Sequence, residues 1–208
     1  MNFPNNCYHP TENKKIAEGI YKTSIDGLLY IMHKTFADER GFFSEIARLP
    51  ELEVITGKSF HVKQINHARS LTNVIRGIHA EGWNKYITIA SGICFSAIAD
   101  VRPHSTTFGN KEYFILGNSE GSLDGSLYIP SGAGNSMAVI DGPVDYIYFV
   151  DCLYQDRDKE GDVAISLFDP DLAIEWPIAR EDMIISERDI NSINLREKYG
   201  EKVFTKKT

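Results

Sequence analysis

Short runs of β-forming residues, separated by glycine or polar clusters, follow one another along most of the chain. The run at 146–150 alternates strictly, so that its two tyrosines share one face and Ile147 and Phe149 share the other. Many short strands with Gly and Pro turns between them predict an all-β sandwich or barrel, here a single jelly-roll-like domain. We expect strands over residues 28–32, 60–66, 74–79, 86–90, 93–101, 112–116, 126–129, 137–140 and 146–153.

Helical signals are few. Residues 51–57 predict a short helix or turn, and residues 189–199 carry apolar positions behind Asp189 or Ser192, either of which is a possible cap. The second pattern predicts one C-terminal helix. Because no linker or internal repeat divides the chain, we expect an irregular N-terminal arm over 1–18, a jelly-roll domain over 19–189, and a helix and tail over 190–208.

Composition narrows the class of protein. Of the 208 residues, 42% are hydrophobic and 25% are charged, which is typical of a globular protein with a packed core. The formal net charge is -7 and the chain has no cluster of Lys and Arg, which argues against a nucleic-acid partner. A nucleotide ligand stays possible, because it needs only a few well-placed cations.

The cysteines and the apolar runs bear on location. Cys7, Cys94 and Cys152 form no CxxC pair, and the last two lie in apolar runs, which predicts buried free thiols in a reducing compartment. Residues 1–15 hold no apolar segment typical of a signal peptide, and no apolar run reaches the roughly 18 residues of a membrane span. We therefore expect a cytoplasmic protein with no membrane partner.

Four side chains are suited to acid–base chemistry or anion binding. His79 ends a β-run just before a Gly-Trp turn, where a strand end can face a barrel mouth and supply a base. Tyr148 lies mid-strand, and a phenol on the inner face of a barrel can donate a proton. Lys85 could stabilise an enolate oxygen, and Arg76 could hold a phosphate. By residue type alone, an ordinary structural role is the more frequent one for each of them.

A set of motifs resembles one known family. Six of them stand in the order and spacing of the dTDP-4-dehydrorhamnose 3,5-epimerase family, from about Gly19 to Asp189. They are FADERGFFSE at 36–45, QIN at 64–66, VIRGIH at 74–79, DVR with STTFG at 100–109, YIPSG at 128–132, and IEWP with ISERD at 174–189. Six ordered motifs are far more specific than any one of them.

The resemblance implies a fold and a substrate. Members are cupin jelly rolls, usually homodimers with strand exchange, and act on a nucleotide-diphosphate sugar such as dTDP-4-keto-6-deoxyglucose without a metal or other cofactor. Metal-binding cupins offer His-x-His, then Glu, then a later His. This chain has His79-Ala80-Glu81 and, after Pro130-Ser131-Gly132, an Asn135 where that later His would stand. One His and one Glu make a poor cage for a transition metal, so we expect none.

The resemblance also implies roles for individual residues. His79 is similar to the general base, Asp189 to the carboxylate that orients it, Tyr148 to the general acid, and Lys85 to the cation near the ketone. The substrate-binding positions, carried over in the same way, are Arg40, Glu45, Gln64, Asn66 and Arg76 for the nucleotide and diphosphate, Tyr154 for stacking on the base, Asn135 in the sugar pocket, and Glu160 and Arg188 as weaker matches.

These residue types suit an inversion next to a ketone. Loss of the adjacent proton gives an enolate, and inversion needs removal on one face and return on the other. Histidine, whose unperturbed pKa is about 6.5, suits removal near neutral pH. We expect inversion of C3, C5 or both in a nucleotide-linked 4-keto-6-deoxyhexose. The alternatives are a mono-epimerase or ketoisomerase on a related nucleotide sugar, and a non-catalytic cupin that binds one.

Four positions depart from the family pattern. Asn135 stands in place of a His, Ser96 in place of an Asp, Glu81 in place of a Gln, and Phe149 in place of the Lys that follows the tyrosine. The acid–base set itself is kept. We therefore expect altered substrate contacts with retained acid–base chemistry.

Overall fold

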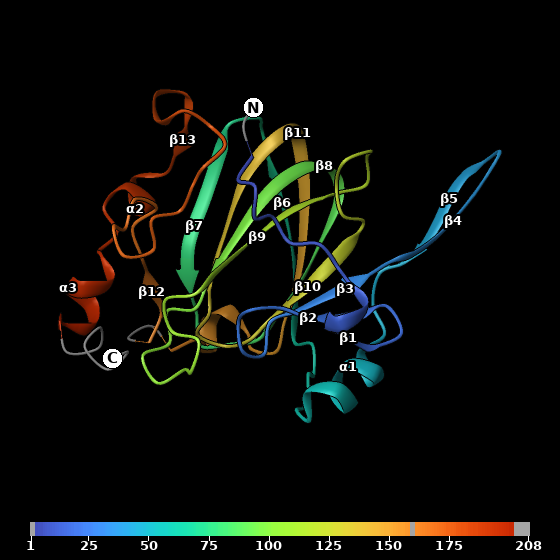
Figure 1. The fold of residues 1–208 in the computed structure, drawn as a ribbon, viewed down its shortest axis with the longest axis horizontal. Coiled ribbons are helices and arrows are strands. Elements are labelled where there is room, and N and C mark those ends of the chain that lie inside the picture. The colour runs from blue at the N-terminus through green and yellow to red at the C-terminus, as the bar shows by residue number, and fades with distance from the viewer. Residues whose placement is uncertain (1–2, 159–160, 202–208) are drawn as a thin grey trace.

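Two long antiparallel strands, β8 (Lys85–Ala99) and β11 (Gly134–Val150), run side by side through the centre of the molecule. The computed structural model describes residues 3–158 and 161–201 (Figure 1). Within that part, eleven strands form one hydrogen-bonded sheet, and a separate pair forms a hairpin. Because β8 and β11 are long enough to bend, their two halves belong to the two layers of a cupin-type jelly roll, as the sequence predicts.

The first layer contains the C-terminal half of β8 and the N-terminal half of β11. The former pairs with β9 (Lys111–Gly117), and the latter with β7 (Val74–Ala80). Two short strands cover opposite ends of the other edge of β7: β12 (Val163–Ala164) is antiparallel to it and β13 (Ile184–Ile185) is parallel. Strand β7 carries the candidate base, so its position between β11 and these short strands fixes the site.

The second layer contains the other halves of the two long strands. The N-terminal half of β8 pairs with β10 (Gly125–Ile129), and β3 (Leu29–Met32), β2 (Ile20–Lys22) and β1 (Lys15–Ala17) follow outward in turn. The C-terminal half of β11 pairs with β6 (Gln64–Ser70), which is an edge strand. The expected strand over 60–66 thus begins later, at Gln64.

The bend in β8 and β11 lies at Gly92 and Asp141. Gly92 has φ +82, and a Cβ there would lie 2.7 Å from the carbonyl oxygens of both Asp141 and Pro143, so a side chain does not fit. The pairing register of the two strands shifts between Asp141 and Asp145. This interruption is why the hydrophobic pattern predicts two strands in each case where the structure has one.

The core lies between the two layers. The inner faces of the long strands supply fully buried side chains such as Ile87, Cys94 and Ile98, and β9 and β10 add Phe114 and Leu127. Full burial of one such side chain stabilises the fold by about 1.5–3 kcal/mol. These are the residues that the alternation places on one face of each strand.

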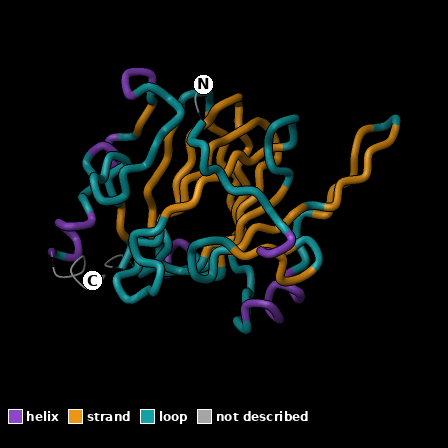
Figure 2. Tube along the Cα trace, viewed as in Figure 1, coloured by secondary structure: helices purple, strands orange, loops and turns teal. Residues whose placement is uncertain are grey.

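Helices occupy the periphery of the strand framework (Figure 2). The predicted short helix near 51–57 is α1 (Leu49–Thr56), which ends at Gly57 with φ 63. The structure also has three short 3₁₀ turns: η1 (Glu12–Lys14), η2 (Tyr154–Asp156) and η3 (Arg180–Asp182).

The expected single helix over 189–199 is wrong. The chain forms α2 (Glu187–Ile190) and then α3 (Leu195–Tyr199). Between them, the Ser192 hydroxyl donates to the Asp189 carbonyl, and Asn194 starts α3 in a capping box. Each local bond competes with continuation of the first helix. The part of the tail beyond residue 201 lies outside the described residues.

A hairpin of β4 (Lys34–Asp38) and β5 (Gly41–Glu45) projects from the body of the molecule (Figure 1). Its three phenylalanines, Phe36, Phe42 and Phe43, are 64%, 62% and 68% exposed. So much exposed aromatic surface on one arm indicates a contact surface. These two strands were not predicted from the sequence.

Two expectations about location can be compared with the structure. Cys94 is buried and free, as expected, whereas Cys152 is only half-buried, because it follows the end of β11; Cys7 is also half-buried and free. No helix in the described ranges combines the length and apolar character needed to cross a bilayer.

Candidate active site

A pocket of about 220 Å³ opens where β7, β11 and the start of β8 come together. Side chains from both layers and from the C-terminal region converge on it. It is lined by Ala68, Arg76, His79, Glu81, Lys85, Asn135, Ser136, Met137, Tyr146, Tyr148, Tyr154 and Arg188. The sequence-predicted base, acid and ketone-side cation are all in this set.

His79 is held by a buried carboxylate from a distant part of the chain. Its Nε2 lies 2.7 Å from Oδ1 of Asp189, whose side chain is 4% exposed, while the imidazole itself is 23% exposed. An ionised carboxylate can only accept, so Nε2 carries the proton and donates it to Asp189. The Nδ1 lone pair is then free to take a proton, and no partner for Nδ1 is found in residues 3–158 and 161–201.

Asp189 is fixed by its own contacts. Its Oδ2 accepts a hydrogen bond of 3.3 Å from the backbone N–H of Gly77, and its backbone N–H donates to the Ser186 hydroxyl that caps α2. Burial acts to raise the pKa of Asp189, but the hydrogen bonds from His79, Gly77 and Ser186 outweigh it and hold the pKa below its usual value. The carboxylate is therefore ionised at neutral pH and fixes the tautomer of His79.

Tyr148 comes from the other layer. It lies on the C-terminal half of β11, opposite Asn66 of β6 and Ile87 of β8, and lines the same pocket as His79. Its ring packs edge-on against that of Tyr146, with centroids 6.0 Å apart. Burial first, and then the charge of Glu81, raise the pKa of Tyr148, so the phenol keeps its proton at neutral pH and can donate it.

Lys85 is a buried residue of the pocket lining. Its side chain is 6% exposed and its ammonium forms an ion pair with Glu81, whose side chain is 16% exposed. The pair is thus removed from water, and each charge depends on the other. A cation there can stabilise an oxyanion on a bound ligand.

Asn135 lies beside the base. It is the ladder partner of His79 across β7 and β11, so the two side chains share a face. Its amide donates to the Tyr146 hydroxyl at 3.1 Å, and that hydroxyl lies 3.3 Å from the amide oxygen. Ser96, by contrast, is fully buried beneath the pocket and donates to the carbonyl of Ser136. Asn135 contacts the pocket and Ser96 does not.

Several residues expected to bind a nucleotide line the pocket or contact residues that line it. Gln64 donates to Asn66 at 2.7 Å and accepts from the backbone N–H of Tyr154 at 2.9 Å, which links β6 to η2. Tyr154 is 56% exposed, and the guanidinium of Arg157 lies over one face of its ring, 3.7 Å from the ring centroid. Arg76 and Arg188 add two guanidinium groups to the lining, from β7 and α2.

Comparison with known proteins gives a consistent result. Residues 22–197 match the family model described as dTDP-4-dehydrorhamnose 3,5-epimerase. The chain belongs to this family. The enzyme of that name from Escherichia coli K12 is 30% identical over 86% of this chain and 95% of its own length. A dTDP-4-dehydrorhamnose 3-epimerase from Streptomyces niveus is 28% identical over 83% of this chain and 82% of its own.

A solved structure supports the family and the fold. The 3,5-epimerase of Legionella pneumophila, in complex with dTDP-4-keto-L-rhamnose, superposes with a TM-score of 0.76 at 30% identity. The match covers 85% of this chain and 92% of that one. The jelly roll predicted from sequence is confirmed.

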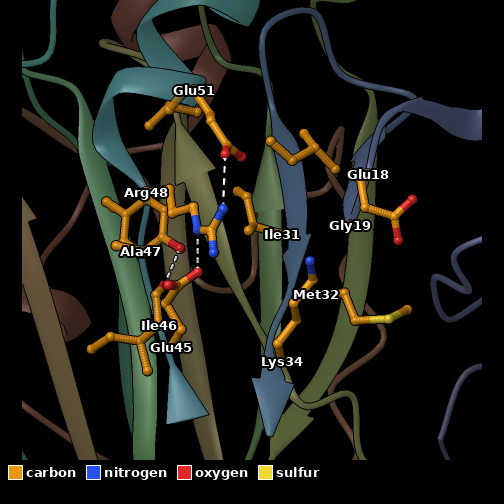
Figure 3. Close-up of a pocket in the computed structure, with 13 residues that line it drawn as sticks. Glu18, Gly19, Ile31, Met32, Lys34, Glu45, Ile46, Ala47, Arg48 and Glu51 are labelled. Carbon is orange, nitrogen blue, oxygen red and sulfur yellow. Dashed lines mark hydrogen bonds and ion pairs between the residues drawn. The ribbon is translucent and has the colours of Figure 1, made fainter.

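Two family-motif residues lie far from the pocket of their own chain. Arg40 is at the tip of the β4–β5 hairpin, where it pairs with Asp38. Glu45 lines a separate pocket of about 120 Å³ between β3, β5 and α1, where Arg48 bridges it to Glu51 (Figure 3). That second pocket contains no histidine, so it lacks the acid–base pair. Glu160 lies outside the described residues.

Tyr146 and Glu81 are among the pocket residues that were not assigned a role from the sequence. Tyr146 is two positions before Tyr148, so the alternation of β11 already placed it on the same inner face. Glu81 was noted as a departure from the epimerase-family pattern and as a position of the metal-cupin pattern, although it lies two positions beyond His79 and lines the pocket. Period-two spacing from a recognised residue was the available signal in both cases.

Proposed function

We propose that this protein is an epimerase that inverts C3, C5 or both of a nucleotide-linked 4-keto-6-deoxyhexose. The observation that carries the proposal is the joint placement of His79, backed by Asp189, and Tyr148 around one pocket, each supplied by a different layer. A mere binder of nucleotide sugars has no need of a histidine with an ionised partner and an unoccupied nitrogen.

The first step is removal of the proton next to the ketone. His79 Nδ1 takes the proton, and the electron pair of the broken C–H bond moves to the ketone oxygen to give an enolate. Asp189 stabilises the imidazolium that results. Lys85, a buried cation of the pocket lining, stabilises the negative charge on the oxygen.

The second step returns a proton to the opposite face. Tyr148 donates its phenolic proton to the carbon, the carbonyl re-forms, and the configuration is inverted. The imidazolium and the phenolate then regain their starting states by exchange with solvent. No electrons are gained or lost overall, so acid–base groups are sufficient for the reaction.

The nucleotide would lie outside the pocket. A volume of about 220 Å³ is small for a whole nucleotide sugar, since sites for drug-sized ligands span roughly 300–1,000 Å³. We propose that the sugar enters and that Arg76 and Arg188 hold the diphosphate at the rim. The face of the Tyr154 ring opposite Arg157 would stack on the base, with Gln64 and Asn66 beside it.

We further propose a homodimer in which the β4–β5 hairpin reaches a second copy. The three exposed phenylalanines and the free edge of β6 support this. Arg40 and Glu45 would then serve the partner's pocket, which explains their distance from their own.

The unpaired state of all three cysteines agrees with a cytoplasmic location.

Mixing two inactive variants tests the hairpin proposal. Chains carrying His79→Asn and chains carrying Arg40→Ala are refolded together. If the hairpin acts in trans, heterodimers regain one intact site and activity returns to a substantial fraction of wild type. Activity no higher than the sum of the separate variants would contradict an exchanged hairpin.

Proton NMR in deuterium oxide tests the reaction itself. With dTDP-4-keto-6-deoxyglucose, the proposed enzyme exchanges the protons at C3, C5 or both for deuterium and gives inverted products. Absence of exchange in every 4-keto nucleotide sugar tried would refute catalysis and leave the binding cupin. Exchange with inversion at one carbon alone would favour a mono-epimerase, the alternative supported by Asn135 beside the base and by the 28% identical 3-epimerase.

A further inference from the structure

Glu81 occupies a place in the pocket for which the proposed reaction gives no role. It follows the end of β7, two positions beyond His79, so both side chains leave the strand on the same face. Its side chain is 16% exposed. A carboxylate so far removed from water is costly unless it is paired, so its presence requires a compensating partner.

Lys85 is that partner, and the dependence is mutual. The backbone of Lys85 is fixed at the start of β8 by pairing with Ile129 and Val150, but its four-carbon stem is flexible. Within the described residues, Glu81 is the one carboxylate found in an ion pair with Lys85. The position of the ammonium in the pocket is therefore set by Glu81.

The charge of Glu81 also reaches the proposed acid. Burial is the first cause of the raised pKa of Tyr148 and Glu81 the second, while Arg76 acts in the opposite direction. Every element packed around the phenol contributes titratable or charged groups. They are Arg76 and His79 from β7, Glu81 after it, Lys85 from β8, Tyr146 from β11, Tyr154 from η2 and Arg188 from α2.

We propose that Glu81 is a positioning residue of the epimerase site: its carboxylate holds the Lys85 ammonium on the ketone side and keeps a negative charge close to Tyr148. The inference rests on the proposed function and adds to it a residue that positions the cation and controls the ionisation of the acid. With Glu81 ionised, the cation is directed and the acid keeps its proton to higher pH. Without that charge, Tyr148 ionises earlier and the site loses its proton donor sooner.

The isosteric variant Glu81→Gln separates charge from shape. The amide can still accept a hydrogen bond from Lys85 but carries no charge. We expect the alkaline limb of the kcat/KM profile to move to lower pH by about one unit, the size of a single charge acting at short range. Glu120→Gln, an equal change of charge on an exposed turn, should leave the profile in place. An alkaline limb unmoved by Glu81→Gln would overturn the proposal.

The truncation Glu81→Ala tests the hold on Lys85. Loss of the carboxylate frees the ammonium, so kcat should fall about tenfold while KM, governed by the nucleotide at the rim, changes little. Glu81→Asp should recover part of the loss, because it restores a carboxylate. Unchanged kcat in a folded Glu81→Ala protein would count against the hold. If Glu81→Ala does not fold, the pH profile of Glu81→Gln still tests the proposal.

A titration that needs no turnover tests the role of Glu81 independently of the proposed epimerase activity. The ultraviolet absorbance of tyrosinate is followed against pH for the wild type and for Glu81→Gln, each minus its Tyr148→Phe counterpart. A lower midpoint for Tyr148 in the Gln variant supports Glu81 even if no sugar is ever exchanged. Equal midpoints overturn it even if the wild type is an active epimerase.

Discussion

Of the three His–Asp pairs in residues 3–158 and 161–201, two have similar contact distances and opposite exposure. In the pocket, His79 lies 2.7 Å from Asp189, with the imidazole 23% exposed and the carboxylate 4% exposed. At the base of the hairpin, His33 lies 2.9 Å from Asp124, but here the imidazole is 4% exposed and the carboxylate 44%. The pairs also differ in the second nitrogen, which in His33 lies 2.6 Å from the Ser126 hydroxyl.

The difference shows what makes such a pair suited to catalysis. Both nitrogens of His33 are occupied, so it has no lone pair for a substrate and serves to tie β10 to the start of the hairpin. Burial lowers the pKa of His33 and outweighs the opposing effect of Asp124. The imidazole of His33 is therefore neutral at pH 7. In the pocket the carboxylate is buried instead, and the imidazole faces the cavity with Nδ1 open. An imidazole that faces the pocket and keeps one nitrogen open, rather than the short contact, distinguishes His79 from His33.

Replacement of the exposed imidazole is expected to have the largest effect. His79→Asn should lower turnover by roughly 10³–10⁴, the upper range for loss of a general base. It should also abolish deuterium exchange into the sugar, since no other group takes the proton. NMR of the sugar protons measures both. Exchange at the wild-type rate in this variant would remove His79 from the reaction.

Tyr148→Phe is expected to separate exchange from inversion. Turnover to inverted product should fall by roughly 10²–10³, because the proton donor on the opposite face is lost. Deuterium should still enter at the carbon that His79 attacks, with retention. Product stereochemistry together with label content provides the test, and full epimerisation by this variant would refute the role of Tyr148.

Asp189→Asn should act through the tautomer of His79. The oxygen of the introduced amide would accept the hydrogen bond from the Gly77 N–H, so its NH₂ group would face Nε2 of His79. Because NH₂ can only donate, Nε2 must then present a lone pair. The proton moves to Nδ1 and blocks the base, so turnover should fall by about 10²-fold. The matched change Asp124→Asn, at the other pair, should leave turnover unchanged.

His33→Gln tests the structural pair. We expect turnover close to wild type and a loss of about 1–3 kcal/mol in the free energy of unfolding, since Ser126 is buried and loses its partner. Urea denaturation measures the loss. A variant with wild-type stability but lowered turnover would reverse the roles assigned to the two pairs.

The smallest expected effect is one of pH on stability. The pKa of folded His33 is lowered, so its contribution is full above the ordinary value of about 6.5 and is lost as pH falls below it. The pKa of Asp189 is also lowered, so its contribution is lost only in more acid solution, below about 4. Urea unfolding between these pH values should show a slope that His33→Gln flattens and Asp189→Asn does not.

Strand positions in the two layers were largely predictable, because their burial produces a pattern. The predicted strands at 74–79, 112–116 and 126–129 agree with β7, β9 and β10 to within a few residues. The hairpin was not predicted. All five residues of β4 are exposed, so it has no buried face and leaves no alternation of apolar and polar positions.

The helical tail was mispredicted for a local reason. Apolar positions at 190, 193 and 195 fit a helical period, but the hydroxyl of Ser192 and the cap at Asn194 divide the segment. The division matters for the site. It leaves Asp189 inside the four-residue helix α2, where its side chain reaches β7 rather than capping a longer helix.

The candidate site was predictable in its acid–base members but not in its internal pairing. Motifs placed His79, Asp189, Tyr148 and Lys85, and the first two are now seen in contact. The pairing of Lys85 with Glu81 depends on where two side chains meet inside a barrel, which no spacing encodes. The same holds for the contact of Asn135 with Tyr146.

The continuity of β8 and β11 through both layers has a consequence for how the protein comes apart. Both layers share these two strands. If the strands of one layer unfold, the other layer therefore loses hydrogen-bonding partners as well. Native-state amide exchange should therefore show the central ladders of both layers opening together, as one cooperative unit, at the free energy of global unfolding. An element attached at a single edge, such as the β4–β5 hairpin, is free to open on its own.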